Sequence, residues 1–182
     1  MKNNALKMTT LCMLTMGVSQ FATAETTRPI LPLLKAQQLP AWCDANLKKI
    51  QKEISNFEKT PVKDNAAAAP ILAKWDKIFA HFEDFSGPIS LYSNVDPDAK
   101  LRKAAEDCEI KINQFHTDIF QNSKLYNVIK NTKATDPIDQ KYRQDILDQF
   151  EDTGVQLEPV KRARMKAILD ELTKLEQEYA QI

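Results

Sequence analysis

Two histidines and three cysteines are the residues of this sequence with the greatest capacity for metal or nucleophilic chemistry. His81 and His116 are far apart, and neither belongs to an H-E-x-x-H motif, which places two imidazoles on one helical face around zinc with a glutamate base between them. His81 precedes Phe82, Glu83 and Asp84, so it could join a carboxylate cluster, but a partly exposed histidine beside helix-end acids is the simpler interpretation. We expect no metal-binding and no catalytic residue in this chain.

The cysteines and serines form no recognisable nucleophile motif either. No G-x-S-x-G sequence is present, and neither Cys43 nor Cys108 lies in a known nucleophile signature. These are the two cysteines beyond the N-terminal apolar segment, and in an oxidising compartment they are a candidate disulfide pair. For a loop of this length the chain-entropy account gives such a bond about 4 kcal/mol. The alternative is two buried thiols, because Cys108 lies on the apolar side of a predicted helix.

Composition excludes several classes of function. Twenty-five basic residues balance 25 acidic ones, so no excess charge would draw the chain to nucleic acid or to an anionic membrane. Only three glycines are present, whereas phosphate-binding loops need several, which excludes Walker and dinucleotide-binding sites. A chain of 182 residues, 43% hydrophobic and 27% charged, is typical of one globular domain with a packed core.

The first residues have the features of a signal peptide. Lys2 and Lys7 precede a mostly apolar stretch over 8–21, and Ala22-Thr23-Ala24 supplies the small residues that signal peptidase requires. We therefore expect a signal peptide over 1–24, cleaved after Ala24, and export to the periplasm. The stretch is too short and too polar to span a bilayer, so no membrane attachment is expected after cleavage.

Helical periodicity dominates the rest of the chain. After an exposed segment at 25–39, apolar residues recur at three- and four-residue steps, which predicts about six helices over 40–182. The expected fold is an antiparallel all-α domain without a sheet. Its first helix covers 40–59 and ends at Thr60-Pro61, the second follows Pro70, and the last begins around Glu158-Pro159 and continues to Ile182.

Capping residues predict where the middle helices begin and end. Asp96-Pro97 and Asp136-Pro137 each combine an N-cap with a first-turn proline, and Gly154 is a predicted stop. Ser86-Gly87-Pro88 is expected to break the second helix. The segment 89–92 is too short for a strand and has no partner run elsewhere, so we expect a loop there.

Two side-chain clusters favour a structural role over ligand binding. The second predicted helix has four aromatic side chains at helical spacing: Trp75, Phe79, Phe82 and Phe85. We expect them in the core rather than around a ligand groove. The densest basic cluster lies early in the last predicted helix: Lys161, Arg162, Arg164 and Lys166. It could meet an acidic peptide or a phosphate, but acids follow within a turn and no aromatics interleave with it, so we expect a solvated helix face.

A series of residues follows a definite order along the predicted helices. It comprises Trp75-Asp76-Lys77-Ile78-Phe79 with Phe82-Glu83, then Leu91, Val95 and Asp96, Leu101-Arg102-Lys103-Ala104, Phe115, Leu125-Tyr126 with Ile129-Lys130, Phe150 with Gly154 and Leu157, and Arg164 to Leu175 with Ile168, Glu171 and Leu172. This series resembles the N-terminal region of the thimet oligopeptidase, neurolysin and oligopeptidase A family of zinc metallopeptidases, over residues 40–182. One departure is Glu151, where the family commonly has a basic residue.

The resemblance implies one wall of a deep channel that admits only short peptides. In that family the zinc and its H-E-x-x-H ligands come later in the chain, so no cofactor and no catalytic residue carries over to this sequence. The leading expectation is the N-terminal channel-wall region of a zinc metalloendopeptidase that hydrolyses short peptides, truncated before the H-E-x-x-H site and inactive alone. The alternatives are a free-standing periplasmic helical module that binds peptides or proteins, and a structural or chaperone-like helical protein.

The last predicted helix bears on the choice of partner. It has no capping residue at its end, and Leu172, Leu175, Tyr179 and Ile182 form an apolar stripe along it. We expect too little protein to cover this stripe, and because burial of such side chains drives association, the expected partners are a catalytic half, short peptides or a second copy of the chain. The alternative is that neighbouring helices already cover the stripe and only the last turn frays.

Overall fold

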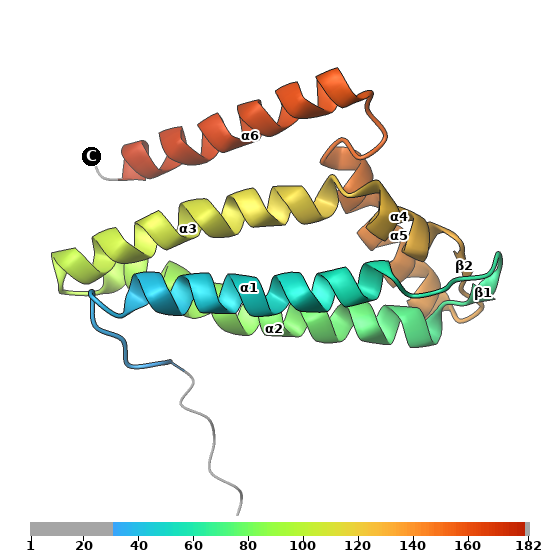
Figure 1. Cartoon of the computed structure of the whole chain (residues 1–182), viewed down its shortest axis with the longest axis horizontal. Helices are drawn as coiled ribbons and strands as arrows, with labels where there is room; N and C mark the ends of the chain where they lie inside the picture. Colours follow the sequence, from blue (N-terminus) through green and yellow to red (C-terminus); the bar gives the residue numbers. More distant parts are fainter. Residues whose placement is uncertain (1–30, 181–182) are drawn as a thin grey trace, which may run out of the picture. The chain divides into compact units, whose positions relative to one another are not determined.

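Residues 31–180 are described by the computed structural model, and helices dominate this part of the chain (Figure 1). The six helices in this range are α1 (Leu39–Glu58), α2 (Ala69–Val95), α3 (Ala99–Phe120), α4 (Ser123–Lys130), α5 (Pro137–Asp152) and α6 (Pro159–Ala180). The all-α fold class is confirmed, whereas the antiparallel order of the helices stays a prediction. The predicted signal peptide lies outside the described residues.

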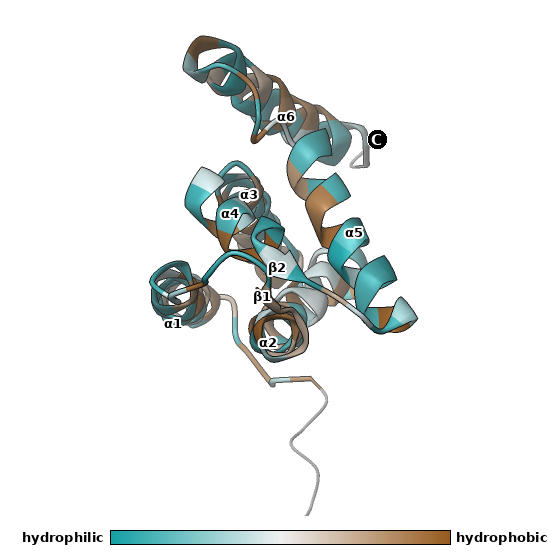
Figure 2. Cartoon of the chain, turned by 90° about the vertical axis from the view of Figure 1, so that its right-hand side faces the viewer, coloured by the Kyte–Doolittle hydropathy of each residue, from teal (hydrophilic) through white to brown (hydrophobic). Residues whose placement is uncertain are grey.

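The core lies between α1, α2 and α3, which run side by side, with α4 and α5 closing one end (Figures 1 and 2). Trp75 of α2 is 2% exposed, and its ring centroid lies 4.6–5.9 Å from those of four phenylalanines: Phe57, Phe79, Phe120 and Phe150. Rings at such separations add to the stabilisation from burial. The predicted core position of the α2 aromatics is therefore confirmed, although Phe79 is only partly buried.

A disulfide between Cys43 and Cys108 crosses this core. Their Cα atoms lie 6.1 Å apart, one on α1 and the other on α3, and both residues are buried. The bond joins positions 65 residues apart in the chain, so it ties the first helix to the third.

Local capping chemistry accounts for both ends of α5. The Asp136 carboxylate accepts hydrogen bonds from the backbone amides of Ile138 and Asp139, and Pro137 occupies the first turn, as predicted. Beyond α5, Gly154 has φ of 90°, a left-handed conformation that glycine adopts without strain. The predicted stop at Gly154 is confirmed.

The break expected at Ser86-Gly87-Pro88 is wrong, because α2 continues through these residues to Val95. Pro88 cannot donate a hydrogen bond to the preceding turn. However, Phe85, Ile89 and Tyr92 are all buried on the same side of the helix, so packing on both sides of the proline outweighs the lost bond. The segment 89–92 is accordingly helical and not a loop.

The predicted start of α3 is also displaced. The Asp98 carboxylate, not that of Asp96, caps the helix by accepting from the backbone amide of Lys100. Asp96 instead accepts from the backbone amide of Asp98 at 2.8 Å, which forms a turn just before the cap. A short Asp side chain can serve either turn or cap, and sequence alone did not separate the two roles.

The expected absence of a sheet is wrong in one small respect. Strands β1 (Ala66–Ala67) and β2 (Thr132–Lys133) pair in parallel, with Ala66 opposite Thr132. Backbone hydrogen bonds from Asn65 to Asn131 and from Ala68 to Lys133 extend the pairing. Two polar loops 66 positions apart therefore satisfy each other's backbone groups at the end of the helical bundle.

The segment before α1 is not uniformly exposed, contrary to the expectation for 25–39. Leu31 and Leu34 pack against the core, and the Tyr92 hydroxyl donates a hydrogen bond to the carbonyl of Pro32. Leu33 remains 92% exposed. None of the helices in residues 31–180 has the length and apolar character that a membrane span requires.

Candidate functional site

His81 contacts a carboxylate, but not one of those predicted from the sequence. Its Nδ1 lies 2.9 Å from Oε2 of Glu53, which belongs to α1. Because an ionised carboxylate only accepts hydrogen bonds, Nδ1 is the donor. Glu83 and Asp84 form no ion pair with His81, and the histidine lies well inside α2 rather than at a helix end. The partner is 28 positions earlier in the chain, and no local signal in the sequence indicates it.

His116 lies elsewhere, on α3, and its environment is apolar. Its ring centroid is 4.6 Å from that of Phe120 and 6.0 Å from that of Phe82, and burial lowers the pKa of the imidazole. The Gln149 side-chain amide, which only donates through its nitrogen, lies 3.2 Å from His116 Nε2, so this ring nitrogen is the acceptor. His116 is therefore a neutral, partly buried histidine that packs against the edge of the hydrophobic core.

Zinc does not fit the residues that the structure describes. A catalytic zinc site needs about three protein ligands. Within residues 31–180, no three His, Cys, Asp or Glu side chains come together in a group that could hold a metal ion. His81 and His116 have separate partners, and the sulfurs of Cys43 and Cys108 are bonded to each other instead of being thiolates.

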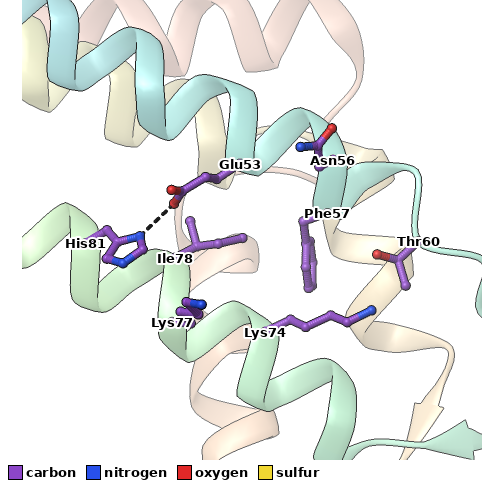
Figure 3. Close-up of a pocket in the computed structure, with 8 residues that line it drawn as sticks. All are labelled: Glu53, Asn56, Phe57, Thr60, Lys74, Lys77, Ile78 and His81. Atoms are coloured by element: carbon purple, nitrogen blue, oxygen red, sulfur yellow. Dashed lines mark hydrogen bonds and ion pairs between the residues drawn. The ribbon is translucent and has the colours of Figure 1, made fainter.

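A groove between α1 and α2 is a candidate site (Figure 3). It has a volume of about 390 Å³, which is within the range of small-molecule sites. Eight residues line it: Glu53, Asn56, Phe57, Thr60, Lys74, Lys77, Ile78 and His81. Phe57 and Ile78 are buried and form an apolar floor, while Lys74 and Lys77 are exposed at the rim.

The charged groups of this groove are unevenly paired. Glu53 is held by His81, whereas neither Lys74 nor Lys77 forms a salt bridge with any carboxylate of residues 31–180. Figure 3 shows the Glu53–His81 pair at one end of the groove and Lys74 extending toward Thr60 at the other, with Phe57 between them. The groove thus has Lys74 at the Thr60 end, an apolar middle, and the Glu53–His81 pair at the other end, with Lys77 nearer to His81 (Figure 3).

A second cavity of about 320 Å³ lies between α2 and α3. Glu109, Asn113 and His116 line it from α3, and Gly87 lines it from α2. Burial raises the pKa of the Glu109 carboxyl, against the opposing effect of hydrogen bonds from Ser93 and Ser90. The cavity is therefore partly polar: Glu109 has hydrogen-bond partners on α2, whereas His116 has its partner, Gln149, on α5.

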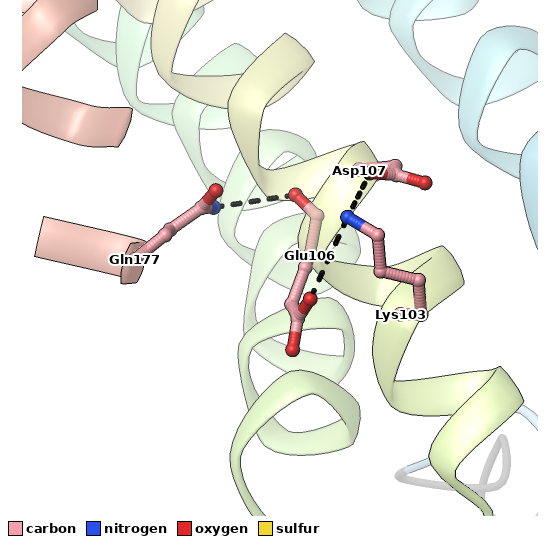
Figure 4. A network of polar contacts seen from close by, with 4 residues as sticks. All are labelled: Lys103, Glu106, Asp107 and Gln177. Carbon is pink, nitrogen blue, oxygen red and sulfur yellow. Dashed lines mark hydrogen bonds and ion pairs between the residues drawn. The ribbon is translucent and has the colours of Figure 1, made fainter. Parts of the chain in front are cut away.

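Helix α6 lies against α3 through polar contacts at both of its ends. Near its C-terminus the Gln177 side-chain amide donates to the Glu106 carbonyl at 3.2 Å (Figure 4). On the same turn of α3, Lys103 Nζ lies 2.8 Å from Asp107 Oδ1 and 3.8 Å from Glu106 Oε2. Only the Gln177 bond joins α6 to α3 at this end, since the Lys103 pairs lie within α3, and no described side chain of α6 is deeply buried.

The basic cluster early in α6 contributes to the same docking. Lys166 pairs with Asp118 of α3 at 2.7 Å, and the Arg162 guanidinium donates to the Gln121 carbonyl at 3.2 Å. Lys161 and Arg164 are exposed. The prediction of a solvated face is therefore wrong for half of the cluster, because α3 presents acceptors to the side of α6 that carries Arg162 and Lys166.

The apolar stripe of α6 is exposed, as predicted. Ile168, Leu172, Leu175 and Tyr179 follow one another at steps of four, three and four residues, and they are 50%, 48%, 54% and 80% exposed. Ile182, the last predicted member, lies outside the described residues. The α6 stripe, defined as these four side chains, faces away from the residues that dock α6 on α3.

No protein family model matches the chain, and no curated protein matches it either. The resemblance to the oligopeptidase family therefore stays a prediction that depends on the residue series in the sequence.

Proposed function

We propose that this chain is the non-catalytic channel-wall region of an exported, periplasmic zinc metalloendopeptidase that hydrolyses short peptides. The observation that carries the proposal is the residue series of the resemblance, which extends over α2 to α6 of one helical unit. Three of its large apolar members, Trp75, Leu101 and Phe150, are at most 5% exposed and occupy core positions. Others are 38–66% exposed: Leu91, Val95, Leu157, Ile168 and Leu172. Residues that determine packing are the ones that a shared fold would retain, and this supports the resemblance.

The α6 stripe supports the same proposal. Full burial of a large apolar side chain is worth about 1.5–3 kcal/mol, so four that are 48–80% exposed leave considerable stabilisation to be gained by covering them. A catalytic portion packed against α6 would cover the stripe. In that arrangement the helical unit restricts access to short peptides, and the reacting groups and the zinc belong to the other portion.

The reading frame that follows the codon for Ile182 provides the most direct test. The proposal expects an open frame that encodes H-E-x-x-H farther on. A frame without that motif would contradict the enzyme assignment. The purified chain itself is expected to hold no stoichiometric zinc and to leave fluorogenic short peptides uncleaved, so one tightly bound zinc per chain would also contradict it.

Covering of the α6 stripe can be tested separately on the purified chain. The parent chain is expected to self-associate in sedimentation and to bind a hydrophobic dye, and Leu175→Ser with Tyr179→Ser is expected to abolish both. Lys174→Ser with Glu178→Ser is the matched control, because both residues are exposed on the same helix outside the stripe. A parent chain that stays monomeric and binds no dye would contradict the need for a covering partner.

A second candidate function is a free-standing helical module that binds peptides or proteins. The groove between α1 and α2 favours it, because apolar residues with a few polar groups are typical of a binding site, and Lys74 and Lys77 pair with no carboxylate of residues 31–180. A stop codon directly after Ile182, together with saturable ligand binding by the monomeric chain, would favour this module over the channel wall.

A further inference from the structure

The groove between α1 and α2 combines charge, apolar surface and hydrogen-bonding groups in a definite order. From it we infer that the groove binds the C-terminal carboxylate of a short peptide that ends in an apolar residue. This inference goes beyond the channel-wall proposal and does not depend on it, since it concerns a surface formed wholly by α1 and α2.

The net charge of the groove suits a monoanion. Two lysines face one glutamate, and that glutamate is engaged by His81 at 2.9 Å. Lys74 and Lys77 lie three positions apart on α2, and residues three apart share one face of a helix. Both ammonium groups are therefore on the rim of the same groove, and neither is neutralised by a described carboxylate.

The apolar residues of the groove favour an anion that carries an apolar side chain. Phe57 is 3% exposed and Ile78 is 8% exposed, yet both line the groove, so their remaining exposed surface is directed into it. This surface is small, so an apolar side chain next to the carboxylate gains a modest amount by covering it, whereas an inorganic anion gains nothing. The volume of about 390 Å³ leaves room for such a side chain together with part of a peptide backbone.

The polar groups at the two ends of the groove favour one orientation of the bound peptide. At the end toward which Lys74 extends, the Thr60 hydroxyl adds a hydrogen-bond donor, so the carboxylate is placed there (Figure 3). At the other end, Glu53 uses Oε2 for His81 and keeps its second oxygen as an acceptor. A peptide N–H one residue before the C-terminus can donate to that oxygen, which a simple organic acid cannot do.

Titration of the isotopically labelled chain with N-acetyl-Gly-Phe, followed by amide NMR shifts, tests this arrangement. Saturable shifts are expected at Phe57, Thr60, Lys74 and His81. The C-terminal amide of the same peptide is expected to bind about twofold to fivefold more weakly, because the exposed charge pair with Lys74 is lost. Phenylpropionate, which has the carboxylate and the ring but no peptide N–H, is expected to bind more weakly than the acid peptide.

Variants that lack lysine charges test which residues cause the difference in binding between the acid and amide peptides. Lys74→Gln with Lys77→Gln is expected to remove the difference between acid and amide peptides, and exposed positions of this kind tolerate the change without loss of fold. Lys49→Gln with Lys52→Gln removes the same charge at the same spacing from exposed positions of α1 that do not line the groove, and should preserve the difference.

Three results would overturn the inference: equal binding of acid and amide peptides, binding of phenylpropionate as tight as that of the peptide, or no saturable shift in the groove. Each readout is binding and not hydrolysis. Failure here is therefore distinguishable from failure of the channel-wall proposal, which the reading frame decides.

Discussion

Reduction of the disulfide between Cys43 and Cys108 should lower the stability of the helical unit by a measurable amount. The bond closes a loop with a separation of 65 residues, which corresponds to an entropy of roughly 15 cal/mol/K in the unfolded chain and to about 4 kcal/mol at room temperature. With a urea m-value of about 2 kcal/mol/M, the unfolding midpoint should fall by about 2 M on reduction.

The same bond should resist reduction while the protein is folded. Cys43 is 0% exposed and Cys108 is 2% exposed, so a reductant reaches the sulfurs only after local or global opening. We therefore expect slow reduction in the absence of urea and rapid reduction near the unfolding midpoint. Quenched alkylation followed by mass spectrometry measures both rates.

Urea unfolding of the oxidised and reduced chains, followed by circular dichroism, measures the change in stability. Cys43→Ala with Cys108→Ala is the control, because added reductant should leave its unfolding curve unchanged. Coincident curves for oxidised and reduced chains would refute the loop-entropy reasoning. Free thiols that react in the native, unreduced protein would refute the bond itself.

Three further changes test the packing and the charge environment of the helical unit. Gly154→Ala should lower the stability by more than about 1 kcal/mol, because its φ is 90° and a Cβ would lie 2.8 Å from a methyl carbon of Leu157; an unchanged thermal midpoint would contradict this. Trp75→Ala should cost about 3–5 kcal/mol in urea unfolding, because its ring contacts four others, and a loss below about 1 kcal/mol would contradict its central position. Burial, and to a lesser extent the Asp76 carboxylate, raises the pKa of Tyr142 from 10.0 to about 12. As the pH rises, the unfolded chain loses the phenol proton before the folded chain does, so stability should fall between pH 10 and about 12. Asp76→Asn should lower that pKa in a phenolate absorbance titration, and an unchanged curve would argue against the carboxylate's contribution.

The groove between α1 and α2 could not be predicted from the sequence. Its lining residues fall into two stretches, 53–60 and 74–81, that a linker and the start of α2 separate. Within each stretch the buried members were recognisable from apolar spacing, as Phe57 was. The contact between Glu53 and His81 depends on how α1 and α2 are rotated against each other, and rotation is a property of packing that neither stretch contains.

The sequence by itself determined most helix positions in this protein, because the signals for them act within one or two turns. Asp136-Pro137 and Gly154 marked their helix ends correctly through side-chain caps and backbone conformation. Apolar spacing placed Trp75 and Phe150 in the core for the same reason, since helical periodicity is local.

Only the tertiary structure decided where local signals conflicted with packing. Pro88 lies within α2 because buried residues on both sides of it hold the helix together, and β1 pairs with β2 because two distant loops meet. Part of the basic cluster docks α6 on α3 because α3 supplies Asp118 and the Gln121 carbonyl at the right positions. In each case the deciding partner lies far away in the chain, so its contribution to the free energy exists only once the helices have packed.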